Sequence, residues 1–161
     1  QQGLPISVIE ANTKVENLVN FMRKIVSENF EINSSINWNT ELHQILTFFS
    51  LENKVSYSSH VLEVQEPVYF RLLLFELMGR IARYPTKNLQ VYVEFVDLGA
   101  GVQMRISVEN VDKKILRVDQ WQEQIELIVK NHFQGSYQEI NDFPRFSMIV
   151  NSQKGIRLKS G

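Results

Sequence analysis

The chain has 161 residues, of which 43% are hydrophobic and 11% aromatic, enough for one domain or for one domain with a helical extension. Its formal net charge of −1 and its pI of about 6.4 offer nothing that attracts nucleic acid or an anionic membrane. The absence of cysteine excludes disulfides, thiolate catalysis and cysteine-ligated zinc, and no apolar run approaches the roughly 20 residues of a membrane span. We therefore expect a cytoplasmic domain, either free or as the cytoplasmic part of a larger membrane-anchored protein.

Residues 5–29 are the clearest predicted helix, and we expect residues 1–29 to be a dimerisation or linker element separate from the rest. Two sets of apolar residues repeat every seven positions, offset by three, as in the a/d seam of a coiled coil. The seam consists of Val8, Ala11, Val15, Leu18, Met22 and Ile25. Val19 and Val26 widen the stripe beyond what a minimal two-stranded coil requires. The pattern favours a homodimer or docking on a partner helix, and the alternative is a helix that lies on its own domain.

The first part of the remaining chain, from residue 30, is predicted to alternate strands and helices. Residues 30–38 read as a short strand and turn, and residues 39–53 as a helix capped by Asn39 or Thr40. Residues 54–64 alternate like one strand. A third helix begins at Pro67 and stops before Pro85.

The second part is predicted to contain two hairpins separated by a helix. Residues 88–110 form a hairpin around the turn Leu98-Gly-Ala-Gly101. The last helix, residues 118–133, is capped by Asp119 and ends before Gly135. A final strand pair follows around Asp142, and the polar tail 154–161 is predicted to fray.

The element order after the first helix is β-α-β-α-β-β-α-β-β. Helices and strands interleave, and the two hairpins make much of the sheet antiparallel. The sequence therefore predicts an α+β fold over residues 30–161, a two-layer α/β sandwich with helices on one face of a mixed sheet.

This order resembles the ATP-binding domain of bacterial sensor histidine kinases over residues 30–153. "PVYFRLLLFELMGRIARYP" stands where that family has its asparagine box, Asn-Leu-Leu-x-Asn-Ala-x-Lys-Tyr. "VQMRISVEN" stands on the strand that enters the Asp-x-Gly-x-Gly box, and "IELIVKNHFQGSY" resembles the last helix and its His-Gly-Gly-Ser turn. Residues 5–29 resemble the end of the second helix of the dimerisation hairpin. The resemblance implies a module of a two-component phosphorelay, and we expect the chain to be an excised fragment.

The residues that would bind nucleotide in this family are replaced. The two box asparagines fall on Glu76 and Arg80, and a guanidinium cannot ligate the Mg²⁺ that the second asparagine helps to hold. The glycine box falls on Glu109-Asn110-Val111-Asp112-Lys113, where Glu109 can still accept a hydrogen bond from an adenine amine but both glycines are missing. The glycine-rich loop falls near Gln120-Trp121-Gln122. We expect Glu76, Arg80, Glu109, Asn110 and Asp112 to be vestigial positions, and no cofactor to bind.

No histidine lies in the N-terminal helix, so the phosphoacceptor of the family is also missing. The chain has three histidines, His43, His60 and His132, which we interpret as surface or helix-face residues. No element carries histidines or carboxylates at metal-ligand spacing, so no metal site is expected.

Three functions fit these observations. The first is a catalytically inactive histidine-kinase-like module that docks the receiver domain of a response regulator. The second is a divergent enzyme that still binds ATP, and the third is a plain structural or dimerisation module.

Candidate docking residues are exposed aromatic and arginine side chains, because such residues carry most binding energy in protein interfaces. Glu76 and Arg80, four residues apart, are expected to pair on a polar face of the third helix, which also carries Arg83. The docking candidates are Tyr69, Arg71, Arg80, Arg83, Trp121, Phe143 and Arg145. The alternative interpretation is core packing for the aromatic residues and simple solvation for the arginines.

Overall fold

The computed structural model describes residues 34–58, 60–83, 88–111 and 119–159. Within these ranges the chain forms three helices and eight strands. The predicted N-terminal helix and its seam lie outside the described residues. None of the described helices is long and apolar enough to cross a membrane.

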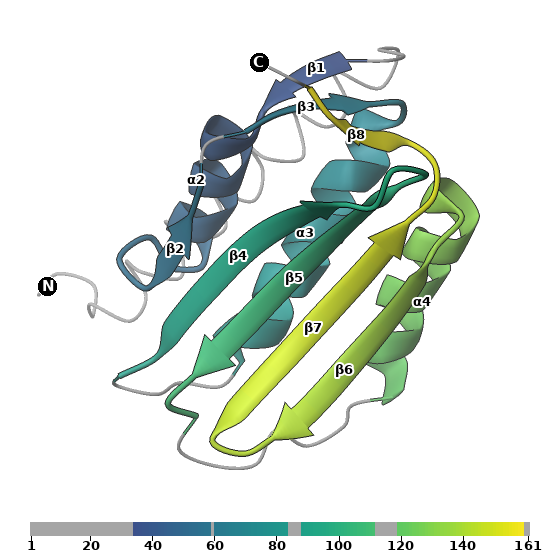
Figure 1. Cartoon of the computed structure of the whole chain (residues 1–161). Coiled ribbons are helices and arrows are strands. Elements are labelled where there is room, and N and C mark those ends of the chain that lie inside the picture. Colours follow the sequence, from purple (N-terminus) through teal and green to yellow (C-terminus); the bar gives the residue numbers. More distant parts are fainter. Residues whose placement is uncertain (1–33, 59, 84–87, 112–118, 160–161) are drawn as a thin grey trace, which may run out of the picture.

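Figure 1 shows the order and arrangement of the described elements. The first five are β1 (Ser34–Asn37), α2 (Trp38–Phe48), β2 (Val55–Tyr57), β3 (Val61–Val64) and α3 (Pro67–Ala82). The last six are β4 (Gln90–Asp97), β5 (Val102–Glu109), α4 (Asp119–Phe133), β6 (Ser136–Asp142), β7 (Arg145–Ser152) and β8 (Ile156–Leu158). The predicted second, third and last helices and both predicted hairpins are therefore confirmed.

The strands form two sheets instead of the single sheet that the sequence predicted. The larger has the order β2-β4-β5-β7-β6 and is mixed, because β2 pairs with β4 in parallel and the other pairs are antiparallel. The smaller has the order β1-β3-β8. Helices α3 and α4 lie behind the larger sheet in Figure 1, and no other described element covers its front face. The predicted α/β sandwich with helices on one face is confirmed.

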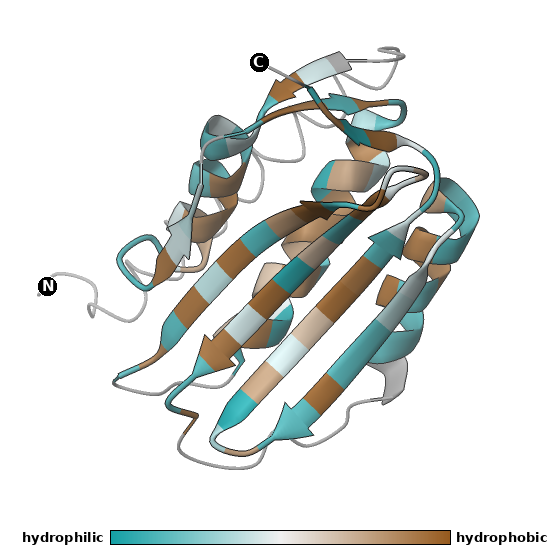
Figure 2. Ribbon diagram, in the orientation of Figure 1, coloured by the Kyte–Doolittle hydropathy of each residue, from teal (hydrophilic) through white to brown (hydrophobic). Residues whose placement is uncertain are grey.

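The core lies between the larger sheet and the helices. Strand β5 shows why: Val102, Met104, Ile106 and Val108 are buried, and the polar residues between them point to the other face (Figure 2). Helix α3 turns a stripe of apolar residues to this core, with Leu73, Leu77 and Ile81 each 2% exposed or less, as predicted. Tyr84, the fourth predicted member of that stripe, lies outside the described residues.

The prediction of one continuous strand over residues 54–64 is wrong. The segment divides into β2, which joins the larger sheet, and β3, which joins the smaller one. Between them the backbone oxygen of His60 accepts a hydrogen bond from the Trp38 amide at 3.0 Å, so the chain is anchored to the start of α2 where it changes sheets. The phase of the alternation also changes here: Val55 and Tyr57 are half-buried in β2, whereas Leu62 and Val64 are buried in β3.

The N-cap of α2 also differs from the prediction of Asn39 or Thr40. Asn37 is the cap, and its side-chain oxygen accepts a hydrogen bond from the Thr40 amide at 3.3 Å. Strand β1 therefore passes into α2 without a linker. The predicted Asp119 cap of α4 involves a side chain outside the described part of the chain.

The prediction that the C-terminal tail frays is wrong as well. Strand β8 pairs with β3, and flanking hydrogen bonds join Gly155 to Gln65 and Lys159 to Val61 at 3.0 and 2.9 Å. Ile156 is 4% exposed and belongs to the main core. The tail is polar in composition because Lys154, Arg157 and Lys159 face solvent, while Ile156 and the partly buried Leu158 pack against the core.

A substitution at Ile156 tests whether the tail belongs to the folded domain. Ile156→Ala should lower the free energy of unfolding by about 2–4 kcal/mol, because it empties a buried site. Urea unfolding followed by circular dichroism measures this difference. The control is Arg157→Ala, at an exposed neighbour, which should change stability by less than about 0.5 kcal/mol. Equal, small effects of both substitutions would contradict the assignment of β8.

Candidate functional site

Helix α3 carries Arg80 into the space between the helix layer and strands β6 and β7. The Arg80 residue is only 1% exposed. Its Nε and Nη2 donate to the two carboxylate oxygens of Glu139 at 3.1 and 3.0 Å, a bidentate arrangement. Its Cζ also lies 5.5 Å from the centroid of the Phe146 ring on β7. The guanidinium is thus held by two strands of the sheet.

Tyr137 completes this arrangement. It lies two residues before Glu139 on β6, so both side chains project toward the helices, and its hydroxyl donates to Glu139 Oε2 at 2.6 Å. Burial raises the pKa of the Tyr137 phenol, the hydrogen bond to Glu139 and the charge of Glu139 raise it further, and Arg80 opposes the shift. The phenol therefore remains a donor throughout the physiological pH range. We call Arg80, Tyr137, Glu139 and Phe146 the Arg80 cluster.

Glu76 lies one helical turn before Arg80 and is half-buried. Its desolvation raises the pKa of its carboxyl group above the ordinary value of 4.5. The bidentate acceptor of Arg80 is Glu139, which the sequence did not predict. The expected pair of Glu76 with Arg80 stays a prediction. The predicted polar, solvated face of α3 is therefore an interior surface at Arg80.

The prediction that Arg71 and Arg80 are exposed docking residues is wrong. Arg71 is 3% exposed, and its Nε and Nη2 each lie 2.9 Å from a carboxylate oxygen of Glu41 on α2. The acceptors lie 30 and 59 residues from their arginines in the sequence, so no local spacing reveals them. The available signal was the presence of arginines in an otherwise apolar helix, because a buried guanidinium requires a carboxylate partner.

Glu109 and Asn110, two of the positions predicted to be vestigial, lie where β5 ends. Glu109 accepts a hydrogen bond from Arg145 Nη2 at 2.9 Å. Asn110 has a φ of 62°, and its side-chain amide donates to the backbone oxygen of Asn88 at 3.1 Å. Val111 is buried, and its amide donates to the Pro144 oxygen at 2.9 Å. The backbone that corresponds to the start of the glycine box is thus fixed to two neighbouring turns.

Three further predicted positions fall outside what the structure describes. Asp112 is one, and the side chains of Gln120 and Trp121 at the start of α4 are the others. Among the described residues, no group of three or more His, Cys, Asp or Glu side chains is arranged to hold a metal ion.

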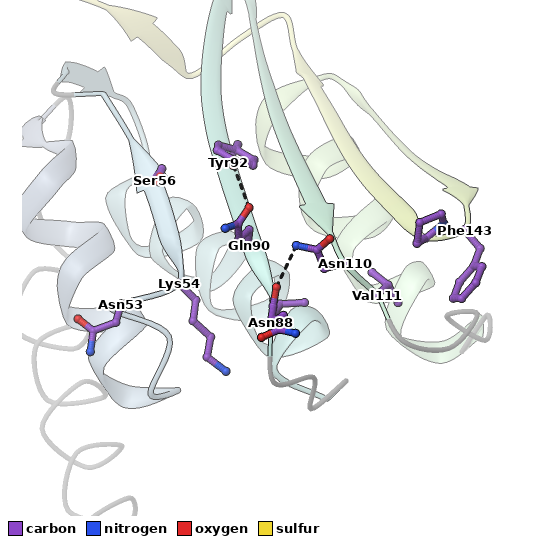
Figure 3. A pocket seen from close by; sticks show the side chains of 11 residues that line it. Asn53, Lys54, Ser56, Asn88, Gln90, Tyr92, Asn110, Val111 and Phe143 are labelled. Carbon is purple, nitrogen blue, oxygen red and sulfur yellow. Dashed lines mark hydrogen bonds between the residues drawn. The ribbon is translucent and has the colours of Figure 1, made fainter.

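A cavity of about 1010 Å³ opens at the end of the larger sheet (Figure 3). Its wall comes from the connection before β2, the start of β4, the end of β5 and the β6–β7 turn, and is rich in carboxamides. Lining residues include Asn53, Lys54, Asn88, Gln90, Asn110 and Phe143. Neither this cavity nor a second one of about 710 Å³ beside β8 has Glu76 or Arg80 among its described lining residues.

The remaining docking candidates lie at opposite ends of the molecule. Phe143, which is 43% exposed, and Arg145 lie at the β6–β7 turn, and Arg83 caps the end of α3 on the same side (Figure 1). Tyr69 lies near the other end of α3, where its ring stacks on His132 with centroids 3.4 Å apart and planes at 11°. The structure therefore brings Arg83, Phe143 and Arg145 to one end and separates them from Tyr69.

Solved structures with a similar fold are histidine kinases. A nucleotide-free catalytic domain of histidine kinase ThkA aligns with a TM-score of 0.58 and 10% identity, covering 77% of this chain and 98% of that one. Histidine kinase AdeS of Acinetobacter baumannii aligns with a TM-score of 0.59 and 12% identity, covering 86% and 76%. At such identities the likeness establishes the fold alone. The chain has the fold of a histidine kinase catalytic domain, and the predicted resemblance is confirmed at that level.

A third similar structure is histidine kinase ThkA in complex with the response regulator protein TrrA. It aligns with a TM-score of 0.56 and 12% identity, covering 95% of this chain and 53% of that chain. No protein-family model matches the chain, and no curated protein matches its sequence.

A double-mutant cycle tests whether Arg80 and Glu139 form one buried unit. Arg80→Met alone should destabilise the domain by about 3–5 kcal/mol, because it leaves the Glu139 carboxylate buried without its counter-charge. Adding Glu139→Leu should recover most of that loss, since two apolar side chains of similar volume replace the pair. Urea unfolding measures each variant.

The control for this cycle is Arg105→Met. The Arg105 side chain is half exposed, and its Nη1 lies 3.8 Å from Glu94 Oε1. Loss of such a surface pair should lower the free energy of unfolding by less than about 1 kcal/mol. If the losses of unfolding free energy caused by Arg80→Met and by Glu139→Leu simply add in the double variant, the two side chains do not interact. That result would refute the buried pair.

Proposed function

We propose that this domain is a catalytically inactive histidine-kinase-like module of a two-component phosphorelay, and that it docks the receiver domain of a response regulator. The observation that supports catalytic inactivity is the buried, bidentate ion pair of Arg80 with Glu139. By resemblance, Arg80 occupies the position of the asparagine that helps to hold Mg²⁺ at the nucleotide phosphates.

Arg80 is chemically unsuited to that task. Mg²⁺ requires oxygen ligands in near-octahedral geometry, whereas a guanidinium offers only hydrogen-bond donors and a fixed positive charge. Its bidentate partner, Glu139, already accepts hydrogen bonds from Arg80 and from Tyr137. A cation at this place would have to displace Arg80 from its ion pair.

The second box supports the same conclusion. A nucleotide-binding glycine box lets the backbone approach the ligand closely. Here the Val111 amide donates to the Pro144 oxygen, and the Asn110 side-chain amide donates to the Asn88 oxygen, so this part of the backbone is held by neighbouring turns of the protein. Loss of nucleotide binding then leaves protein binding as the function that the fold can retain.

The likeness to ThkA, whose structure was solved with a response regulator protein, supports a receiver as the partner. The end of the molecule that carries Arg83, Phe143, Arg145 and the cavity provides a suitable surface. An exposed aromatic ring beside arginines is the composition that protein interfaces favour, and the cationic groups complement an acidic partner. We assign receiver docking to this end.

A binding measurement tests the proposed docking surface. Purified receiver domains encoded by the same genome are titrated against the full chain by biolayer interferometry. At least one should bind, and Arg145→Ala should raise its Kd about 5- to 30-fold, as expected for an arginine near the centre of an interface.

The matched control is Arg105→Ala. Arg105 and Arg145 are both surface arginines, with side chains 50% and 61% exposed, and each is paired with a glutamate. Arg105 lies in the middle of β5, away from the docking end, so its removal should leave Kd within about twofold. Absence of binding by every receiver, or equal effects of the two substitutions, would refute the proposed docking.

A further inference from the structure

Three phenylalanines form a half-buried surface where α2 and α3 meet. The ring centroids of Phe48 and Phe49 are 4.8 Å apart, and those rings lie 5.3 and 5.0 Å from Phe75. Phe75 lies on the side of α3 opposite the buried stripe of Leu73 and Leu77, so this surface is turned away from the larger sheet.

The same side of α3 continues the surface in both directions. Leu72, about one turn before Phe75, is half-buried. Gly79, one turn after Phe75, is buried and has no side chain, so it permits close approach of another element. We call Phe48, Phe49, Leu72, Phe75 and Gly79 the α2–α3 aromatic surface. It is apolar, is formed by α2 and α3, and is turned away from the larger sheet.

The chain supplies its own candidate for this surface in residues 5–29. The apolar seam of that segment must be buried for the helix to be stable, because a 25-residue amphipathic helix gains little from propensity alone. Val19 and Val26 widen the seam, and a wide stripe suits a groove between two helices better than the single contact line of a two-stranded coil.

Geometry allows the contact within one chain. As a helix, residues 5–29 would be about 37 Å long, more than twice the roughly 16 Å of α2. The segment reaches the described fold at Ser34, and β1 leads directly into α2, so its tether begins next to the helix layer. The link between residue 29 and Ser34 is only four residues. Such a short tether gives the N-terminal segment an effective concentration at this surface in the millimolar range, above the concentration of a second chain in dilute solution.

We propose that residues 5–29 dock in cis on the α2–α3 aromatic surface through the seam of Val8, Ala11, Val15, Leu18, Met22 and Ile25. The occupant is the N-terminal segment of the same chain and not a second copy. The seam is then covered in the isolated module, and self-association through it requires the helix to leave this surface. This inference concerns a different face from the proposed receiver-docking end and does not depend on it.

Because the chain has no cysteine, pairs of introduced cysteines test this contact cleanly. Leu72→Cys is combined with Leu18→Cys in the seam, and, as the matched control, with Asn20→Cys on the opposite side of the predicted helix. A short bismaleimide should cross-link the Leu18 pair within one chain at least about tenfold faster than the Asn20 pair. Mass spectrometry of a mixture of isotopically labelled and unlabelled protein separates cross-links within a chain from those between chains.

Two results would overturn the proposal. Equal cross-linking rates for Leu18→Cys and Asn20→Cys would mean that the seam does not face α3. Products that contain both isotopes, with rates that rise with protein concentration, would assign the surface to a second copy. Circular dichroism of both double variants before labelling establishes that each is folded, so a slow reaction reports position and not unfolding.

Discussion

The ion pair between Arg80 and Glu139 is the constraint on which the arrangement of the helix layer depends. A guanidinium in the interior requires a carboxylate that is equally buried, and β6 supplies one that is 4% exposed. Tyr137 donates a hydrogen bond to this carboxylate, and the Phe146 ring offers the guanidinium an aromatic face. The pair therefore connects α3 to the far edge of the sheet at the place where, by resemblance, a kinase would hold its nucleotide phosphates.

A second pair repeats this arrangement at the other end of α3. Arg71 binds Glu41 on α2 with the same bidentate geometry, so α3 is joined by buried arginines both to its neighbouring helix and to the sheet. Such pairs stabilise a fold weakly compared with apolar packing, but they tolerate the loss of neither partner. Helix α3 therefore fixes the layers of the domain to one another.

Much of the fold could be predicted from the sequence, because local signals define it. Pro67 marks the start of α3, and strict alternation defines the β4–β5 hairpin. What could not be predicted involves distant partners: the change of sheet near His60 and the pairing of β8 with β3. The same holds for the site. By resemblance, the sequence aligns Glu76 and Arg80 with the box asparagines, whereas the burial of Arg80 depends on Glu139, 59 residues away.

We propose that the Arg80 cluster stands in place of a nucleotide site. Calorimetric titration of the full chain with Mg-ATP and Mg-ADP tests it most directly, with a nucleotide-binding histidine kinase domain as positive control. We predict no binding heat in the titration and, in a thermal unfolding scan, no rise in Tm at millimolar nucleotide. If nucleotide did bind, a concentration 100 times its Kd would raise the free energy of unfolding by about 2.7 kcal/mol. Saturable binding in the micromolar range, with the matching rise in Tm, would contradict the account.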